Sequence, residues 1–309
     1  MDGDHVIEVR VEADVAGARL DVFVGGLPGV GSRSRAEVLI SGGAVLVDGA
    51  VRQRSHRLKA GQVVQVIALP PSSEEGGPPQ AENMAVPVTY EDEFLLVVDK
   101  PAGLVVHPAQ GHPTGTLVNA LLHYGLAGGE VGRPGIVHRL DKDTSGLMVV
   151  VRDADVHARL VKMIRQRVVK RCYLALVHGR PAQLGTIEAP IGRHPRYRKT
   201  MTVGGATSRE AVTHFAILEE FRNYTLVEAG LQTGRTHQIR VHFRAIGHPV
   251  CGDPVYCRRD PLRIGRQFLH SHQLAFRHPV TGEELSFRSP LPEDLARVVA
   301  RLRETGGTS

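Results

Sequence analysis

The hydrophobic positions of the first seventy residues predict a small unit that begins with two helices. Leu20, Val24 and Leu27 recur at the three- and four-residue spacing of one helical face. A second helical run follows and is expected to end at the glycine pair 42–43, because glycine readily adopts the left-handed conformation that closes a helix.

A hairpin is predicted after the second helix. Val45 and Val47 lead into Asp48-Gly49, a dipeptide that favours a two-residue turn between antiparallel strands, and Val51 continues the chain beyond it. Another strand is predicted at residues 63–67. The expected order in this unit is therefore two helices and then strands.

The composition changes abruptly after this unit. Residues 70–83 read PPSSEEGGPPQAEN, a stretch of Pro, Gly, Ser and Glu that has nothing to pack into a core. We therefore predict a small domain at residues 17–69, a linker at residues 70–83 and a large domain at residues 84–309.

The large domain combines many strands with a few helices. Apolar runs predict strands at residues 94–98, 147–151, 168–177, 212–218 and 224–231. Helical spacing predicts helices around residues 156–164, 239–246 and 295–302. Several strands follow one another without a helix between them, which favours a largely antiparallel sheet over a doubly wound one. The predicted fold class is α+β with a mixed, mainly antiparallel sheet.

Composition and charge narrow the class of protein. The 309 residues are 42% hydrophobic and 23% charged, with a formal net charge of +6 and a pI of about 9.5, which is ordinary for a globular protein. A positive balance favours a polyanionic partner, although the same charge would also serve solubility alone. No apolar run approaches the roughly 20 residues of a membrane helix, and three cysteines make no disulfide framework. We expect a cytoplasmic protein that does not bind membranes.

The densest cluster of polar residues is the segment GIVHRLDKDTSG at residues 135–146. Its acidic spacing from Asp141 is similar to a calcium-binding loop, but that loop requires a glutamate at its twelfth position, where this sequence has Arg152. Its Asp-Lys dipeptide also occurs in pumps that form an aspartyl phosphate, but those proteins need membrane helices. Both interpretations are therefore rejected.

The sixteen histidines do not predict a metal site. His237 and His242 are five residues apart, not four, and lack the glutamate of the zinc-binding helix motif. Cys251 and Cys257 do not form a CxxC pair. We expect no bound metal.

Five segments together resemble the RluA/RluD family of RNA pseudouridine synthases. The central one is HRLDKDTSG at residues 138–146. The others are LVVHPAQGHPTGTLVNALLHY (104–124), KRCYLALVHG (170–179), LQTGRTHQIRVH (231–242) and RQFLHSHQLAF (266–276). They occur in the family's order between about residues 90 and 290. The resemblance implies the isomerisation of uridine to pseudouridine in structured RNA, without a cofactor or a metal.

The small domain resembles the S4 RNA-binding domain, which many members of that family carry. Its segment SRSRAEVLISGGAVLVDGAVRQRSHRLKAGQVV has the helix–helix–hairpin order of that domain. The resemblance implies that basic side chains of this domain contact RNA phosphates. These are Arg33, Arg35, Arg52, Arg54, Arg57 and Lys59.

The resemblance also implies roles for residues of the large domain. Asp141 is expected to be the catalytic carboxylate, either as a nucleophile at C1′ or as a base at C2′. Arg235 is expected to pair with it and keep it ionised. A cation without an anionic partner would be unfavourable at a helix start, which supports this role. Tyr173 is expected to stack on the target base, with a core tyrosine as the alternative, and Leu269 to pack on the base's other side. Arg139 is expected to fill the space that the extruded uridine leaves.

The S4-like domain and the stretch GHPTGTLVNALLHY are most similar to RluD-like members. The expected substrate is a stem-loop uridine in large-subunit ribosomal RNA, with transfer RNA as the alternative. We expect a monomer that binds RNA and not DNA. Two rival functions are a non-catalytic RNA-binding factor and a nucleosidase, for which Asp143 would have to activate water.

Overall fold

The computed structural model divides into two compact units, Met1–Gly77 and Pro78–Ser309. It describes residues 6–28, 30, 33–67, 79–108, 112–129, 133–197, 200–205, 207–257 and 259–305. Most of the predicted linker at residues 70–83 lies outside the described residues. Each unit is described by itself below.

The N-terminal unit packs two helices on a four-stranded sheet. The helices are α1 (Leu20–Gly25) and α2 (Arg33–Ser41), and a short 3-10 turn, η1 (Ala13–Val15), precedes them. The sheet has the order β1 (Val6–Arg10), β4 (Val63–Ile67), β2 (Val45–Val47), β3 (Ala50–Val51). Asp48 and Gly49 both have positive φ, at 51° and 74°, as the predicted hairpin turn requires.

Strand β1 lies outside the predicted bounds of this unit. It pairs antiparallel with β4, from Val6 opposite Ile67 to Arg10 opposite Val63. The unit therefore begins before residue 17, where the small domain was predicted to start. The alternation in β1 is short and mixed with charged residues, so its place in the sheet follows from pairing with β4 rather than from its own pattern.

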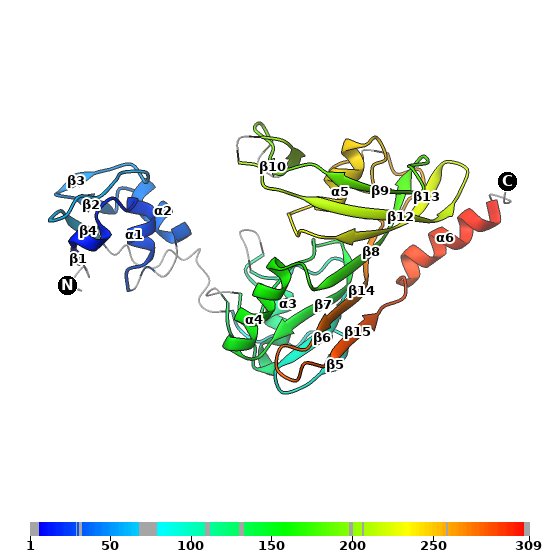
Figure 1. The fold of residues 1–309 in the computed structure, drawn as a ribbon, viewed down its shortest axis with the longest axis horizontal. Helices are drawn as coiled ribbons and strands as arrows, with labels where there is room; N and C mark the ends of the chain where they lie inside the picture. Colours follow the sequence, from blue (N-terminus) through cyan, green and yellow to red (C-terminus); the bar gives the residue numbers. More distant parts are fainter. Residues whose placement is uncertain are drawn as a thin grey trace. The chain divides into compact units, whose positions relative to one another are not determined.

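The C-terminal unit is built around one nine-stranded sheet (Figure 1). The strand order is β5 (Val88–Glu91), β6 (Leu95–Lys100), β7 (Ser145–Val151), β14 (Leu269–Arg277), β8 (Lys170–His178), β13 (Tyr224–Leu231), β12 (Val212–Glu220) and β9 (Leu184–Glu188), and β15 (Glu284–Arg288) pairs with β14. Among the paired strands of the described residues, only β7 and β14 run parallel, so the prediction of a largely antiparallel α+β fold is confirmed.

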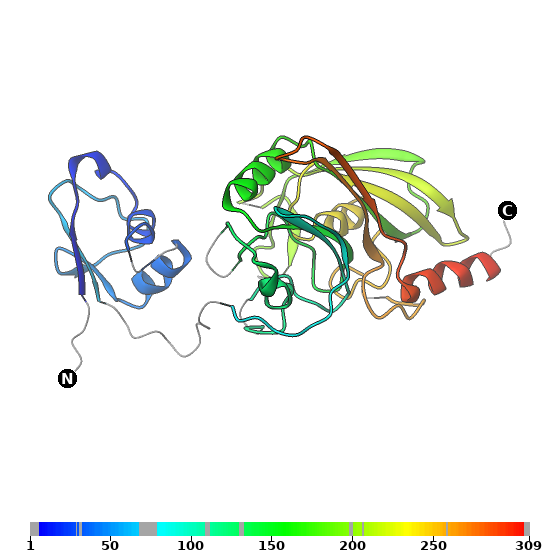
Figure 2. The same cartoon turned by 90° about the horizontal axis from the view of Figure 1, so that it is seen from below.

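Helices cover the two halves of this sheet separately. Figures 1 and 2 show α3 (Leu117–Leu121), its continuation η2 (Leu122–Tyr124) and α4 (Ala154–Arg165) beside the half that contains β5, β6 and β7. The other half carries α5 (Gln238–Ala245) and the hairpin of β10 (Ile191–Arg193) and β11 (Met201–Val203). Helix α6 (Glu293–Thr305) closes the unit through a buried face that joins the main core.

Side-chain packing explains why these helices form. Phe243 of α5 meets Phe215 of β12 with ring centroids 5.3 Å apart in an edge-on arrangement. On the other half, Leu160 of α4 belongs to the same buried cluster as Leu147 and Val149 of β7. The predicted helical spacings are therefore confirmed as the buried faces of α4, α5 and α6.

A glycine brings the two central strands together. Gly146 of β7 lies opposite Ser271 of β14 and has φ of 112°, a conformation that suits only glycine. A Cβ atom at this position would lie 2.3 Å from the backbone oxygen of Ser271. This close approach anchors the end of the loop that carries Asp141. Within the described part of the chain, no helix is long and apolar enough to cross a membrane.

Candidate active site

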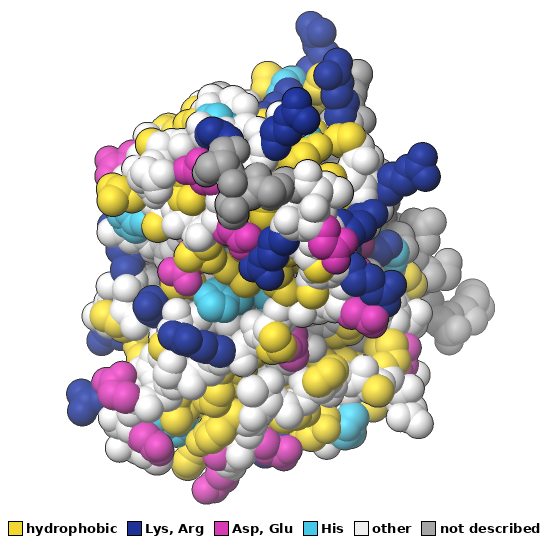
Figure 3. All heavy atoms as spheres, turned by 90° about the vertical axis from the view of Figure 1, so that its right-hand side faces the viewer, with side chains coloured by type: hydrophobic (Ala, Val, Ile, Leu, Met, Phe, Trp, Pro, Cys, Tyr) yellow, Lys and Arg dark blue, Asp and Glu magenta, His cyan; other side chains and the backbone are white. Residues whose placement is uncertain are grey.

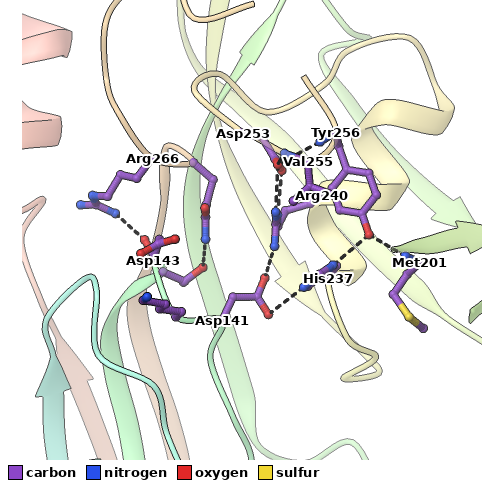
Figure 4. A network of polar contacts seen from close by, with 12 residues as sticks. Asp141, Asp143, Met201, His237, Arg240, Asp253, Val255, Tyr256 and Arg266 are labelled. Atoms are coloured by element: carbon purple, nitrogen blue, oxygen red, sulfur yellow. Dashed lines mark hydrogen bonds and ion pairs between the residues drawn. The ribbon is translucent and has the colours of Figure 1, made fainter. Parts of the chain in front are cut away.

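Asp141 lies on the loop that leads into β7, at the junction of the two halves of the sheet (Figure 4). Its carbonyl oxygen accepts a hydrogen bond of 3.1 Å from the backbone N–H of Thr144, which closes a tight turn. Arg266 supports the same turn by donating to the carbonyl oxygen of Asp143 at 2.9 Å and pairing with Asp294 of α6. The loop is therefore held by its own turn and by Arg266 from the segment before β14, which Asp294 of α6 fixes in place.

A single guanidinium links Asp141 to a second carboxylate. Arg240 Nη1 donates to Asp141 Oδ2 at 2.8 Å. Its Nε and Nη2 donate to the two oxygens of Asp253 at 2.6 and 2.8 Å, a bidentate pair. The Arg240 side chain is 5% exposed and Asp253 is fully buried, whereas Asp141 keeps 17% exposure. The arrangement fixes one oxygen of Asp141 and leaves part of the carboxylate open to solvent.

The charges around Arg240 decide its ionisation. Burial acts to lower the pKa of Arg240, but the hydrogen bonds and negative charges of Asp253 and Asp141 outweigh it and raise the pKa above its usual value. Arg240 is therefore a permanent cation between two carboxylates. It binds Asp141 through a charge-assisted hydrogen bond and Asp253 through two.

His237 approaches Asp141 from the same segment. Its Nε2 lies 3.9 Å from Asp141 Oδ1, and its Nδ1 meets the hydroxyl of Tyr256 at 2.8 Å. That hydroxyl also accepts from the backbone N–H of Met201 at 2.8 Å. Since the hydroxyl oxygen accepts from Met201, its proton is available to His237 Nδ1, which would leave Nε2–H facing Asp141.

His237 also has an unusual backbone. Its φ of 58° and ψ of 21° place it in the left-handed region directly before α5. Non-glycine residues in this region are uncommon, and they concentrate at functional sites where the surrounding contacts hold them. Burial lowers the pKa of His237, although Asp141 opposes this shift. The ring is therefore neutral at pH 7.

The prediction that Arg235 pairs with Asp141 is wrong. The Arg235 side chain donates through Nε to the carbonyl oxygen of Glu210 at 2.9 Å. Arg235 precedes the helix, where its backbone N–H is bound by Gln238, while Arg240 lies in the first turn of α5 and faces Asp141. Because α5 begins after Arg235, Arg240 is the arginine that reaches Asp141. A cation in a first helical turn is unfavourable, and here the two carboxylates compensate for it.

Tyr173 and Leu269 lie on neighbouring strands of the same sheet. Leu269 of β14 is opposite Ala175 of β8, two residues from Tyr173, so the two side chains share one face. Both are 4% exposed and belong to the main core cluster. Burial raises the pKa of Tyr173, and the charge of Asp141 acts in the same direction. Tyr173 is therefore within electrostatic reach of Asp141, and its stacking on a base stays a prediction.

Arg139 is exposed on the loop that precedes Asp141. Desolvation lowers its pKa, Asp141 opposes this, and Arg133 adds to the lowering. The guanidinium thus lies in the field of the Asp141 carboxylate and of another cation. Its expected insertion into RNA stays a prediction.

Sequence reasoning missed most of the groups that surround Asp141. The sequence analysis assigned no role in the site to Asp253, His237 or Tyr256. Its argument that a cation is unfavourable at a helix start, which was applied to Arg235, applies equally to Arg240. Asp253 stands in the stretch CGDPVY, whose acidic residue among apolar neighbours is the available signal. Its oxygen also accepts the backbone N–H groups of Val255 and Tyr256.

The basic residues of the N-terminal unit are partly engaged within the unit itself. Arg33 pairs with the buried carboxylate of Asp21 at 2.8 Å, and Arg54 pairs with Glu37 at 3.1 Å. Arg57 donates to the carbonyl oxygen of Gly17 at 2.7 Å. Arg52 and Arg54 also line a surface hollow of about 690 Å³. Contact of these residues, and of Arg35 and Lys59, with phosphate stays a prediction.

Asp21 provides a test of what holds the N-terminal unit together. The hydrogen bonds from Arg19 and Arg33 hold its pKa far below the usual value. A depressed folded-state pKa stabilises the fold above the unfolded pKa of about 3.9, and this contribution is lost as the pH falls. We expect Asp21→Asn to lower the melting temperature of this unit at pH 7, and the difference from wild type to shrink between pH 4 and pH 2.5.

Scanning calorimetry of the full chain across this pH range would measure the effect. Glu37→Gln is the matched control, because its pair with Arg54 is exposed and worth little. A difference between Asp21→Asn and wild type that stays constant down to pH 2.5 would contradict the assigned role of the ion pair.

The described residues hold neither a metal cluster nor a disulfide. No group of three or more His, Cys, Asp or Glu side chains there is arranged to hold a metal ion. Cys172, Cys251 and Cys257 are free thiols.

On the face shown in Figure 3, Lys and Arg side chains gather over the upper right of the view, with acidic side chains scattered among them.

Comparison with known proteins adds to this geometry. Residues 94–245 match the family model described as RNA pseudouridylate synthase, and residues 18–64 match the S4 domain. A protein of Nitrosomonas europaea named ribosomal large subunit pseudouridine synthase D is 43% identical over 98% of this chain and 89% of its own length. An uncharacterized RNA pseudouridine synthase of Chloroflexus aurantiacus is 48% identical over 93% of this chain and 90% of its own length. The structure of human RNA pseudouridylate synthase domain containing 1 matches with a TM-score of 0.54 at 26% identity, over 78% of this chain and all of that one.

Proposed function

The chain belongs to the family of RNA pseudouridine synthases, and from this premise we propose that it converts specific uridines of large-subunit ribosomal RNA to pseudouridine. The ribosomal substrate is supported by relatives named ribosomal large subunit pseudouridine synthase D, which match over nearly the whole chain. The S4 domain supports an RNA substrate independently.

The observation that carries the proposal is the carboxylate of Asp141. One of its oxygens is bound by the buried cation Arg240, and the carboxylate stays partly exposed on a loop between the two halves of the sheet. The reaction breaks the bond from C1′ to N1 of uridine, turns the base and rejoins it through C5. Nothing is oxidised, and the base is retained, so a positioned ionised carboxylate facing the ribose meets the chemical requirement.

Asp141 has two mechanistic options that use the same geometry. As a nucleophile it would attack C1′ and hold the sugar while the base turns. As a base it would remove the proton from C2′. Arg240 serves both options, since it binds Oδ2 and leaves Oδ1 for the sugar. We assign Arg240, in place of Arg235, as the cation that pairs with Asp141.

The base would occupy the face shared by Tyr173 and Leu269. A uridine must leave its helical stack to reach an enzyme carboxylate, at a cost of a few kcal/mol. An aromatic ring can offset part of this cost because stacking tolerates rotation of the base in its own plane. Arg139, two residues before Asp141, would fill the space left in the RNA.

The S4 domain would hold the RNA phosphates, and the protein would act as a monomer in the cytoplasm.

Complementation of a bacterial host tests the proposal. The wild-type chain would be expressed in a strain that lacks its own large-subunit pseudouridine synthase D, with the empty vector as control. Chemical mapping of pseudouridine across total RNA should then show new sites in large-subunit ribosomal RNA. New sites confined to transfer RNA would change the assigned substrate, and an unchanged map would leave an RNA-binding factor as the function.

A further inference from the structure

A cavity of about 310 Å³ lies beside the loop that carries the candidate catalytic carboxylate. Its lining includes His107, Arg133, His138 and Arg139, with His157 of α4. A volume of this size falls at the lower end of the range of small-ligand sites. It would accommodate one phosphate group with part of the attached sugar.

The charge of the lining is positive. Two guanidiniums, Arg133 and Arg139, belong to it, and the lining residues that the structure describes include no acidic side chain. Burial lowers the pKa of His107 to about 4, and both guanidiniums push it further in the same direction. Burial likewise lowers the pKa of His138 to about 3. The histidines are therefore neutral at pH 7, and the two guanidiniums supply a field that attracts anions.

Two buried histidine nitrogens of the lining find no hydrogen-bond partner among the described residues. His107 is 4% exposed, and its Nδ1 is one of them. His138 accepts the backbone N–H of Val149 through Nε2, so its proton must be on Nδ1, which is the other unpaired atom. A buried donor without a partner costs free energy, and such atoms are expected where a ligand completes the set.

Hydrogen bonds within the protein hold the wall of the cavity in place before any ligand binds. The Nε2 atom of His157 donates to the carbonyl oxygen of Ile136 at 3.1 Å. The backbone N–H of Gly135 donates to Gly128 at 2.9 Å, and Val151 of β7 donates to Gly135 at 3.0 Å. The cavity is thus tied to the same strand that holds the Asp141 loop, so a ligand bound there would be positioned relative to the carboxylate.

Arg139 connects the cavity to the candidate active site. It lines the cavity, its charge acts on His107, and it lies in the field of Asp141 two residues further along the chain. We infer that the cavity binds a backbone phosphate of the substrate RNA next to the target uridine, through Arg133, the Nδ1–H of His138 and, in the tautomer protonated at Nδ1, His107. This inference rests on the proposed function. It assigns to Arg133 and His107 a role in placing the strand, separate from the reaction itself.

Chemical removal of a single phosphate charge tests the inference. A stem-loop RNA containing a uridine found by the mapping experiment would carry one neutral methylphosphonate at each phosphate near that uridine in turn. Affinities would be measured in an Asp141→Asn background, so that turnover does not interfere. We expect one position to weaken binding about ten-fold, in the range of a charge-assisted hydrogen bond.

The decisive readout is the coupling between that phosphate and Arg133. Arg133→Gln should weaken binding of the natural RNA about ten-fold and reduce the salt slope by about one phosphate contact. It should also abolish the penalty of the methylphosphonate at that one position, because the contact is already lost. Arg133→Lys should restore part of the affinity. Arg297→Gln, an exposed arginine on α6, is the matched control with the same charge change.

The possible outcomes distinguish a failure of the phosphate-site inference from a failure of the proposed function. Conversion of the unmodified stem-loop by the wild-type chain shows that the proposed function holds. If conversion occurs and the penalties of Arg133→Gln and of every methylphosphonate simply add, the cavity holds no backbone phosphate. Inorganic phosphate added at millimolar concentration should compete only weakly with the RNA. Strong competition, with unchanged methylphosphonate penalties, would identify a free phosphate as the ligand and overturn the inference.

Discussion

Replacing Asp141 by Asn is expected to slow the single-turnover conversion of uridine by at least about 10³-fold while leaving RNA affinity nearly unchanged. The amide has the shape of the carboxylate but can neither attack C1′ nor remove a proton, and general-base catalysis alone contributes roughly 10²–10⁴. The measurement is release of tritium from 5-tritiated uridine in a stem-loop RNA, with affinity followed by filter binding.

The structure makes Asp141→Asn a clean variant for this purpose. Arg240 keeps its bidentate pair with Asp253 when Asp141 is neutralised, so no buried cation loses its main partner. We therefore expect the melting temperature to stay within a few degrees of wild type. Retained activity above about a tenth of wild type would remove Asp141 from the catalytic role.

Arg240→Ala and Arg235→Ala should differ widely, although the two arginines are five residues apart. Arg240→Ala leaves the fully buried Asp253 without its guanidinium, and breaking a buried ion pair costs roughly 3–5 kcal/mol of unfolding free energy. It also removes the cation that binds Asp141, so the conversion rate should fall by about 100-fold or more. Arg235→Ala loses one bond to a carbonyl oxygen and should cost under about 1 kcal/mol.

Urea unfolding and single-turnover conversion of the two variants provide the comparison. Because Arg240→Ala could fail through folding alone, Arg240→Lys is the informative second variant. Lysine keeps the charge but cannot reproduce the fork on Asp253, so it should recover part of the stability and little of the rate. Equal losses of rate in Arg235→Ala and Arg240→Ala would contradict the pairing seen in the structure.

The elements of the fold could largely be anticipated from local patterns. The Asp48-Gly49 turn, the end of α2 directly before the glycine pair 42–43 and the buried faces of α4 and α6 all arise from residues that are close in sequence. Their physical causes, backbone conformation and the periodicity of apolar side chains, act within a few residues. Strand β1 escaped prediction because only its pairing with β4, more than fifty residues away, makes it a strand.

The candidate site shows the same division. The segment around Asp141 stands out in the sequence because acidic, basic and hydroxyl residues crowd between two apolar runs. Its environment comes from elsewhere: Arg240 lies 99 residues further along the chain, and Asp253 lies beyond that. The close approach of Gly146 to Ser271 depends likewise on a strand pairing between distant segments.

The class of fold, the family resemblance and the candidate carboxylate could all be read from residue types in a local order. Which arginine meets that carboxylate follows from the packing of distant segments. Arg235 and Arg240 stand in one short segment with equal charge, and local spacing cannot distinguish them. The start of α5 and the packing of Phe243 on β12 turn Arg240 toward Asp141 and Arg235 toward Glu210, since the direction of a side chain follows from the helix that carries it.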